Sequence, residues 1–229
     1  MQSILFSDVL KSICSEPLEV LSIDHTGDNF VYIDLSKTNS DLDAVDVSSS
    51  EKFHKYIEAY LRTNKADVAY GGYLETRSIY KRSIHFNKQD VATERNIHLG
   101  IDLWCQDGTG VLAVLEGIVH SIKNNTNYGD YGPTIILKHH YQDVIFYTLY
   151  GHLSIESINT LKVGDSVTQG QCIGYLGTSQ VNGDYPPHLH FQVIKDLQGL
   201  EGDYPGVCNK KDVDFYALNC PNPNILLKI

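Results

Sequence analysis

Residues 96–104 read NIHLGIDLW, in which aliphatic residues alternate with histidine, glycine and aspartate. Because successive side chains of a β-strand point to opposite faces, a strand here places His98, Gly100 and Asp102 on one face. The aliphatic residues between them then point the other way, into a core. The segment therefore predicts a strand that presents an imidazole and a carboxylate on the same surface.

Residues 186–193, PPHLHFQV, show the same alternation and place His188 and His190 on one strand face. Polar groups that share a buried strand face are costly without a partner, so a metal or an open cleft is expected to compensate. Two such strands can surround a small cation with imidazole nitrogens and a carboxylate oxygen, a ligand set that suits Zn²⁺.

Short apolar runs separated by Gly, Asn, Asp and Pro indicate further strands within residues 110–123, 134–140, 144–154 and 188–195. This spacing is typical of a mainly β protein, and we expect an antiparallel β-sandwich or a barrel-like arrangement. The last thirty residues contain GDYPG and CPNPN and are expected to be irregular and to wrap back on the surface.

The first part of the chain differs in composition. Residues 29–36, NFVYIDLS, predict a strand, and the acidic run at 40–46 predicts a loop. Residues 48–64 predict an amphipathic helix behind a serine cap at Ser49 or Ser50. Its apolar stripe consists of Phe53, Tyr56, Ile57, Tyr60 and Leu61.

We therefore expect three parts. A small N-terminal α/β appendage occupies residues 1–67, a β domain occupies 68–200, and an irregular C-terminal tail that packs on the β domain occupies 201–229.

The overall composition limits the function. The chain has 229 residues, 42% hydrophobic and 20% charged, which indicates a self-folding globular protein. Its net charge of −10 disfavours a nucleic acid partner, because phosphate binding needs a basic surface. No apolar run reaches the roughly 18 residues of a membrane span. No signal peptide is visible, so a cytoplasmic location is expected for the chain as given, or a periplasmic or extracellular one if a leader was removed.

Five cysteines, odd in number and without close pairs, predict neither a disulfide framework nor a cysteine zinc site. Six histidines are expected to have surface or packing roles: His25, His54, His85, His120, His139 and His140. The sequence leaves the oligomeric state open.

The motifs HLGID and PPHLHF, with YGHLS at 150–154 and LKVGDSVTQGQCIGYLG at 161–177, resemble the lysostaphin/LytM family of zinc metalloendopeptidases. The resemblance covers roughly residues 95–196 and implies the duplicated hybrid motif fold. GGYLETRSIY at 71–80 and CPNPN at 220–224 are further similar to a subgroup sometimes fused to pyridoxal-phosphate aminotransferases.

The resemblance also implies a site. It assigns one Zn²⁺ to His98, Asp102 and His190 and places His152 and His188 beside it as catalytic residues. The implied reaction is hydrolysis of peptide (amide) bonds, in peptidoglycan-type or related peptides, by a zinc-activated water. His188 is the expected general base and His152 would position the water or the oxyanion, although the sequence does not decide between the two.

The chain departs from the family at one point. Several members carry a tyrosine shortly before the HxxxD motif that helps to stabilise the oxyanion, and residues 87–96 contain none. Tyr80, Tyr128 and Tyr131 are candidates for that role.

Two other functions stay open at this stage. One is a non-catalytic member of the fold that binds glycan or peptide. The other is a phosphocarrier, because glucose-type sugar phosphotransferase carriers have a histidine in a similar H-x-G-I-D context that accepts a phosphoryl group. Those carriers lack the HxH pair found here at His188 and His190.

Overall fold

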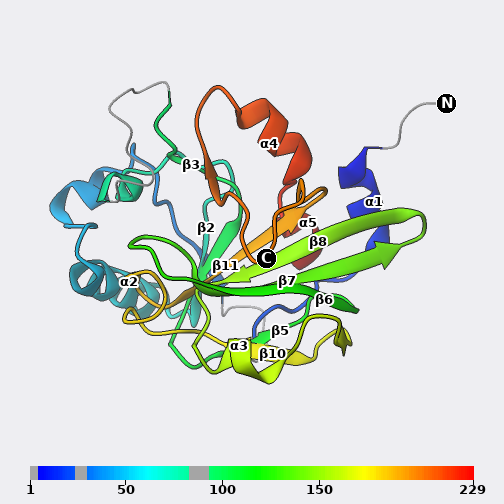
Figure 1. The fold of residues 1–229 in the computed structure, drawn as a ribbon. Coiled ribbons are helices and arrows are strands. Elements are labelled where there is room, and N and C mark those ends of the chain that lie inside the picture. The colour runs from blue at the N-terminus through cyan, green and yellow to red at the C-terminus, as the bar shows by residue number, and fades with distance from the viewer. Residues whose placement is uncertain (1–4, 24–29, 83–92) are drawn as a thin grey trace.

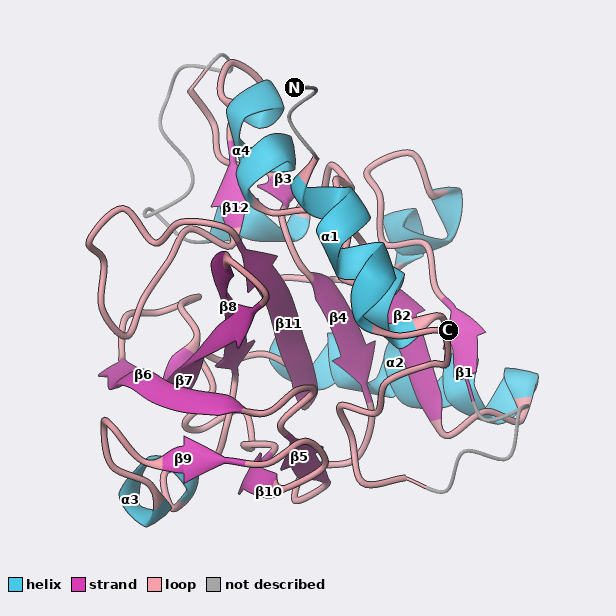
Figure 2. Cartoon of the chain, turned by 90° about the vertical axis from the view of Figure 1, so that its right-hand side faces the viewer, coloured by secondary structure: helices cyan, strands magenta, loops and turns pink. Residues whose placement is uncertain are grey.

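The computed structural model describes residues 5–23, 30–82 and 93–229. Its centre is a sheet of eight strands (Figures 1 and 2). In spatial order these are β1 (Phe30–Tyr32), β2 (Val68–Gly71), β4 (Ile101–Trp104), β11 (His188–Ile194), β8 (Val144–Gly151), β7 (Gly132–Tyr141), β6 (Gly117–Asn125) and β9 (Ser166–Val167). Neighbours pair antiparallel except β1 and β2, which are parallel. The mainly β, antiparallel-rich prediction is confirmed, and the sheet is open because β1 and β9 lie at opposite edges.

Two small sheets and several helices complete the described chain. Strand β5 (Gly110–Leu112) pairs with β10 (Cys172–Tyr175), and β3 (Ile97–His98) pairs with β12 (Val207–Cys208). The helices are α1 (Phe6–Ile13), α2 (Ser50–Asn64), α3 (Ser157–Thr160), α4 (Val213–Asn219) and α5 (Asn224–Leu227), with 3-10 turns η1 (Ser40–Ala44) and η2 (Ile79–Arg82). Among the described residues, no helix has both the length and the apolar character that a bilayer crossing requires.

The central strand β11 is buried along its whole length, and its alternation separates two faces of the sheet. Leu189, Phe191 and Val193 enter a core that also contains α1, α5 and the β5–β10 pair. His188 and His190 therefore point to the opposite face. Helix α2 lies on that second face, and Figure 2 shows α1 and α2 on opposite sides of the sheet.

Helix α2 confirms the prediction of an amphipathic helix behind a serine cap. The Ser49 hydroxyl accepts a hydrogen bond from the Lys52 backbone N–H. Phe53 and Ile57 are buried, and the Phe53 ring meets Trp104 edge-on at a centroid distance of 5.2 Å. This contact fixes α2 against strand β4.

Two local predictions were wrong. The acidic run at 40–46 was expected to be a loop, but its first part forms η1, because the Asn39 side chain accepts a hydrogen bond from the Asp41 N–H and starts the turn. The last thirty residues were expected to be irregular, but they contain α4 and α5. Pro223 stands directly before α5, where the fixed φ and missing N–H of proline suit a helix start.

The N-terminal residues contribute directly to the sheet and its core. Strand β1 extends the sheet at β2, and α1 contacts α5 near the other chain end. The division into an appendage at 1–67, a β domain at 68–200 and a tail at 201–229 stays a prediction.

Candidate active site

Strand register assembles the centre of the site. In β4 and β11 the facing residues are Asp102 and His190, and across β11 and β8 His190 faces Gly151. Gly71 of β2 faces Asp102 from the other side. The row therefore crosses four strands, with the two functional side chains flanked by glycines, and His152 follows directly at the end of β8.

The sequence predicted one continuous strand over NIHLGIDLW, and this prediction was wrong. The segment divides into β3 and β4, with Leu99 and Gly100 between them. A Cβ atom on Gly100 would lie 2.6 Å from His190 Cε1 and 2.7 Å from Phe191 O. The chain thus leaves the sheet where the His190 ring packs on it, and β3 brings His98 over the same point.

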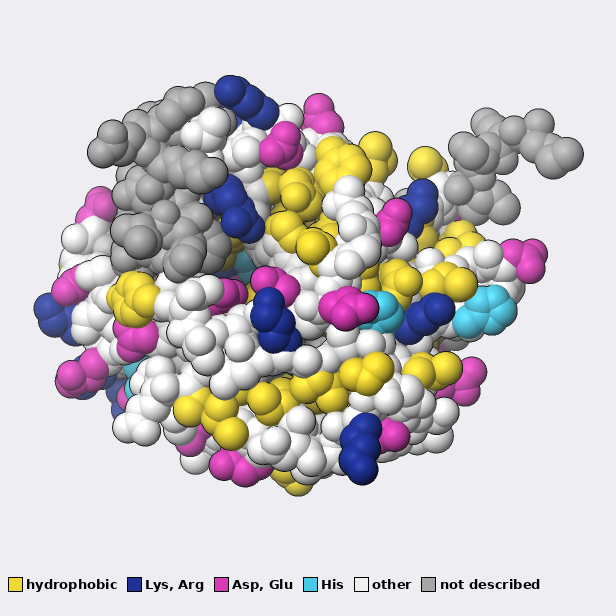
Figure 3. Space-filling view, viewed as in Figure 1, with side chains coloured by type: hydrophobic (Ala, Val, Ile, Leu, Met, Phe, Trp, Pro, Cys, Tyr) yellow, Lys and Arg dark blue, Asp and Glu magenta, His cyan; other side chains and the backbone are white. Residues whose placement is uncertain are grey.

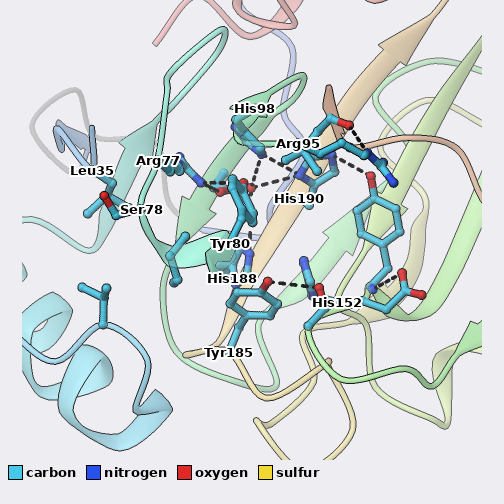
Figure 4. Close-up of a pocket in the computed structure, with 18 of the residues that line it drawn as sticks. Leu35, Arg77, Ser78, Tyr80, Arg95, His98, His152, Tyr185, His188 and His190 are labelled. Atoms are coloured by element: carbon cyan, nitrogen blue, oxygen red, sulfur yellow. Dashed lines mark hydrogen bonds and ion pairs between the residues drawn. The ribbon is translucent and has the colours of Figure 1, made fainter. Parts of the chain in front are cut away.

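Three of the predicted residues, His98, Asp102 and His190, meet in one place. Figure 4 shows His98 and His190 of this group beside Arg77. His98 Nε2 lies 2.9 Å from His190 Nδ1 and 3.2 Å from Asp102 Oδ1. His190 Nδ1 lies 3.1 Å from the same carboxylate oxygen. All three side chains are 2–3% exposed, and at these distances their atoms are in direct contact.

The outer hydrogen bonds of both imidazoles fix which nitrogen carries the proton. His98 Nδ1 lies 2.9 Å from Gly72 O and His190 Nε2 lies 2.9 Å from Gln192 Oε1. A carbonyl oxygen accepts only, and the Gln192 amide is oriented by its donation to Pro205 O. The outer nitrogens therefore carry the N–H, and the two inner nitrogens face each other and the carboxylate with lone pairs.

His188 and His152 are arranged in the same way. Their Nδ1 atoms lie 2.8 Å from Pro186 O and 2.7 Å from Asn182 O, so both Nδ1–H groups donate outward. The two rings lie 4.2 Å apart, centroid to centroid. His188 Nε2 is 3.9 Å from Asp102 Oδ1. Each ring thus keeps a basic Nε2 at the site without belonging to the three-residue cluster.

The ionisation of the site follows from its burial. Burial lowers the pKa of His98 and of His188 to about 4, and it holds the pKa of His152 well below its usual value. For Asp102, burial opposes ionisation, but the neighbouring His98 and Arg77 outweigh it and hold the pKa well below the usual value. An unprotonated His98 beside an ionised Asp102 is the charge state that a metal ion requires of such ligands.

His152 adopts a left-handed backbone conformation, with φ of 64°. Such a conformation is uncommon outside glycine and costs free energy that neighbouring structure must offset. Here the His152 N–H donates to Tyr131 O and the Gly177 N–H donates to His152 O. The strained backbone is therefore held from both sides, and it turns the ring toward His188.

The structure adds Arg77, which the sequence reasoning missed. Its side chain is 3% exposed and donates through Nη1 to Asp102 Oδ2 and through Nε to Glu75 Oε2, at 2.6 Å. In sequence, the alternation of Glu75 and Arg77 in an extended segment is the one available signal, and it does not show that either residue approaches the HxxxD motif.

The three candidate tyrosines separate clearly. Tyr128 is 49% exposed and is not among the residues that line the pocket, whereas Tyr80 and Tyr131 both line it. Tyr131 Oη lies 3.4 Å from His190 Nε2 and donates to Tyr204 O. Burial raises the pKa of Tyr131 well above its usual value, so it stays a neutral hydroxyl.

These groups line a cavity of about 460 Å³. The N-terminal part of the chain contributes apolar residues to its lining, among them Leu35, Leu42, Val47 and Phe53, together with polar ones. Asn127, Asp130 and Asp203 line it from later loops. The cavity is therefore lined by residues far apart in the sequence, both apolar and polar.

The remaining histidines are peripheral to this cluster. His139 is a buried structural residue, with Nδ1 donating to Glu116 O and Nε2 2.7 Å from Thr148 Oγ1. His54, His120 and His140 lie outside the cavity. His25 and His85 lie outside the described residues.

Residues 96–203 match the profile of Peptidase family M23. Lysostaphin of Staphylococcus staphylolyticus is 31% identical over 113 residues, which are 49% of this chain and 22% of that protein. The peptidoglycan DD-endopeptidase ShyC of Vibrio cholerae is 34% identical over 98 residues, 42% of this chain and 20% of that protein. The chain therefore spans about a fifth of the length of these relatives.

Among solved structures, the catalytic domain of lysostaphin from Staphylococcus simulans is similar at 26% identity. The match covers 53% of this chain and 80% of that chain, with a TM-score of 0.37. His98, Asp102, His152, His188 and His190 all fall inside the profile match. Over residues 96–203, the chain is therefore similar to peptidase family M23, and its relatives are of the lysostaphin/LytM type.

Proposed function

We propose that this chain is a zinc-dependent endopeptidase that hydrolyses peptide (amide) bonds in peptidoglycan-type or related peptides. The observation that carries the proposal is the convergence of three lone-pair donors in a buried place. Two unprotonated imidazole nitrogens and one carboxylate oxygen lie 2.9–3.2 Å apart, with no proton available between the nitrogens. Without a cation these groups would repel one another at a cost that burial increases.

His98, Asp102 and His190 would hold the ion. Their donor set of two imidazoles and one carboxylate fits Zn²⁺, and three protein ligands are typical of catalytic sites. A bound Zn²⁺ supplies a Lewis acid that polarises the substrate carbonyl and increases the acidity of water. Gly72 O and Gln192 Oε1 hold the two imidazoles in the required tautomers, as outer partners do in metalloproteins.

His188 and His152 would move the proton. Each has an Nε2 lone pair at the cavity and an Nδ1–H fixed to a backbone carbonyl, so each can accept a proton from water and return it to the leaving amine. Once protonated, either imidazolium is stabilised by the nearby Asp102 carboxylate. Tyr80 and Tyr131 are neutral hydroxyl donors at the same cavity, available to a developing oxyanion.

The substrate class rests on the relatives. They are named lysostaphin, glycyl-glycine endopeptidase and peptidoglycan DD-endopeptidase. The cavity of about 460 Å³ around the cluster, lined by apolar and polar residues, supports a peptide as the substrate. A cell-wall substrate also favours the periplasmic or extracellular alternative for the chain's location.

Metal analysis combined with a hydrolysis assay tests the proposal. The purified chain should contain one zinc per molecule and release new amines from muropeptides or simple peptides, detected by mass spectrometry. His98→Ala, Asp102→Ala and His190→Ala should each lose the zinc, and His120→Ala, at a histidine outside the cavity, should keep it. Full zinc content in all three ligand variants, or no hydrolysis by the zinc-loaded chain of any peptide tried, contradicts the proposal.

A further inference from the structure

Arg77 connects the cluster to the N-terminal part of the chain. It donates from Nη1 to Asp102 Oδ2 and from Nε to Glu75 Oε2. Glu75 in turn accepts a hydrogen bond through Oε1 from the Leu35 backbone N–H, at 3.1 Å. A continuous series of contacts therefore runs from the segment after β1 to the carboxylate of the cluster, through side chains that are almost fully buried.

We propose that Arg77 is a positioning residue, which holds Asp102 with Oδ1 toward His98 and His190, and that Glu75 holds Arg77 in place. This inference rests on the metal site of the proposed function. A carboxylate has two equivalent oxygens and rotates freely about its last torsion. The contact between Arg77 and Oδ2 removes that freedom, and it leaves one oxygen for the ion.

The local backbone is shaped around this guanidinium. Gly72 has φ of 101°, a conformation that side chains rarely tolerate, and a Cβ there would overlap Arg77 Nη2. The Gly72 carbonyl also accepts the outer proton of His98. Gly72 therefore has two roles. It leaves room for Arg77, which orients Asp102, and its own carbonyl orients His98.

Two physical effects of Arg77 oppose each other, so the sign of the result is informative. A positive charge next to a ligand disfavours a cation, and its removal alone should tighten metal binding. Loss of the fixed carboxylate orientation should weaken binding. Arg77 contacts Glu75 and Asp102 through two different nitrogens. A lysine would keep the positive charge but has one nitrogen, so it cannot reproduce both contacts. A Lys substitution therefore isolates the positioning effect.

The test measures Zn²⁺ affinity of the full chain by competition with a chromogenic chelator. Arg77→Lys and Arg77→Met should bind Zn²⁺ about 10–100-fold more weakly, the usual result of losing an outer partner of a ligand. Glu75→Gln should weaken binding less, because its amide oxygen can still accept from Arg77. Arg95→Met is the matched control, since Arg95 also lines the cavity but donates to Val207 O. Its Zn²⁺ affinity should match that of the original chain.

The Co²⁺-substituted protein gives a second readout, because its visible spectrum reports the ligand arrangement. The spectrum should change in Arg77→Lys and stay the same in Arg95→Met. If Arg77→Met does not fold, this comparison still tests whether Arg77 positions Asp102. Unchanged or tighter Zn²⁺ binding by folded Arg77→Lys overturns the inference, as does equal weakening in Arg95→Met. Absence of zinc binding by the original chain would instead overturn the proposed function.

Discussion

At the scale of single residues, four histidines divide into two pairs, to which the proposed function assigns metal binding and proton transfer. His98 and His190 contact each other and the Asp102 carboxylate, whereas the His188 and His152 rings lie beside them, tilted by 34° to one another. The sequence places all four, because their motifs lie on strand ends. It does not place their outer acceptors, since Gly72, Gln192 and the rest carry no recognisable pattern.

His188→Ala and His152→Ala should retain zinc and lose about 10²–10⁴-fold in turnover, the usual contribution of a general acid or base. Neither residue belongs to the three-residue cluster, so metal content should not change. Zinc content, melting temperature and turnover are measured on the same preparations. Near-normal turnover in both variants would exclude the proposed proton transfer, and zinc loss in His188→Ala would mean that the ligand set is wrong.

His139 predicts a pH dependence of folding. Burial lowers its pKa to about 4 from the ordinary 6.5, so the native state favours the neutral ring. Its stabilising contribution is complete above pH 6.5 and is lost as the pH falls toward 4. Between about pH 7 and 4.5 the free energy of unfolding should drop by about 2–3 kcal/mol through this group. Urea titrations at both pH values should show a smaller drop in His139→Gln; an equal drop would assign the effect elsewhere.

At the scale of elements, the sequence predicts β11, β7 and β8 well because their apolar runs alternate or continue to the ends of the strands. It predicts one strand where β3 and β4 stand, because alternation is unaffected by the break at Gly100. At this break the chain packs against the His190 ring of β11, which follows Asp102 by 88 residues. A contact of that range leaves no mark in the local pattern.

Gly100→Ala tests this close approach. The new Cβ would lie 2.6–2.7 Å from the His190 ring and from Phe191 O, so the ring or the backbone must move, at a cost of about 1–3 kcal/mol. Zinc per folded molecule should fall as His190 is displaced. Gly170→Ala is the control, because its Cβ would meet nothing within 4 Å and its backbone strain lies far from the cluster. Full zinc retention in folded Gly100→Ala would show that the site tolerates the shift.

At the scale of the whole molecule, the cavity is built from parts that the sequence analysis assigned to different regions. Residues before 67 line it together with residues from the loops after β6 and β11. The N-terminal residues therefore shape the cleft as well as extend the sheet. Figure 3 shows acidic and basic side chains interspersed over one face of the molecule, without a basic patch for a polyanion.

Leu42→Ala should change substrate binding more than chemistry. Leu42 lines the cavity without contacting the histidine cluster, so its loss should raise KM about 5–30-fold for a peptide with an apolar side chain, from roughly 1–2 kcal/mol of lost burial. The kcat should change little. Val45→Ala is the matched control on the same turn, because Val45 does not line the cavity. Equal KM values in the two variants would remove Leu42 from the substrate site.

The pairing of β4 with β11 also has a consequence for how the protein matures. Asp102 and His190 become neighbours only when strands distant in the chain have closed, a slow class of contact in folding. An incompletely folded molecule therefore offers His98 and Asp102 but lacks the third donor. Under the proposed function, the zinc-to-protein ratio of a preparation then reports the fraction of molecules whose sheet is complete, and synthesis of the chain beyond His190 sets the earliest moment at which it can cut anything.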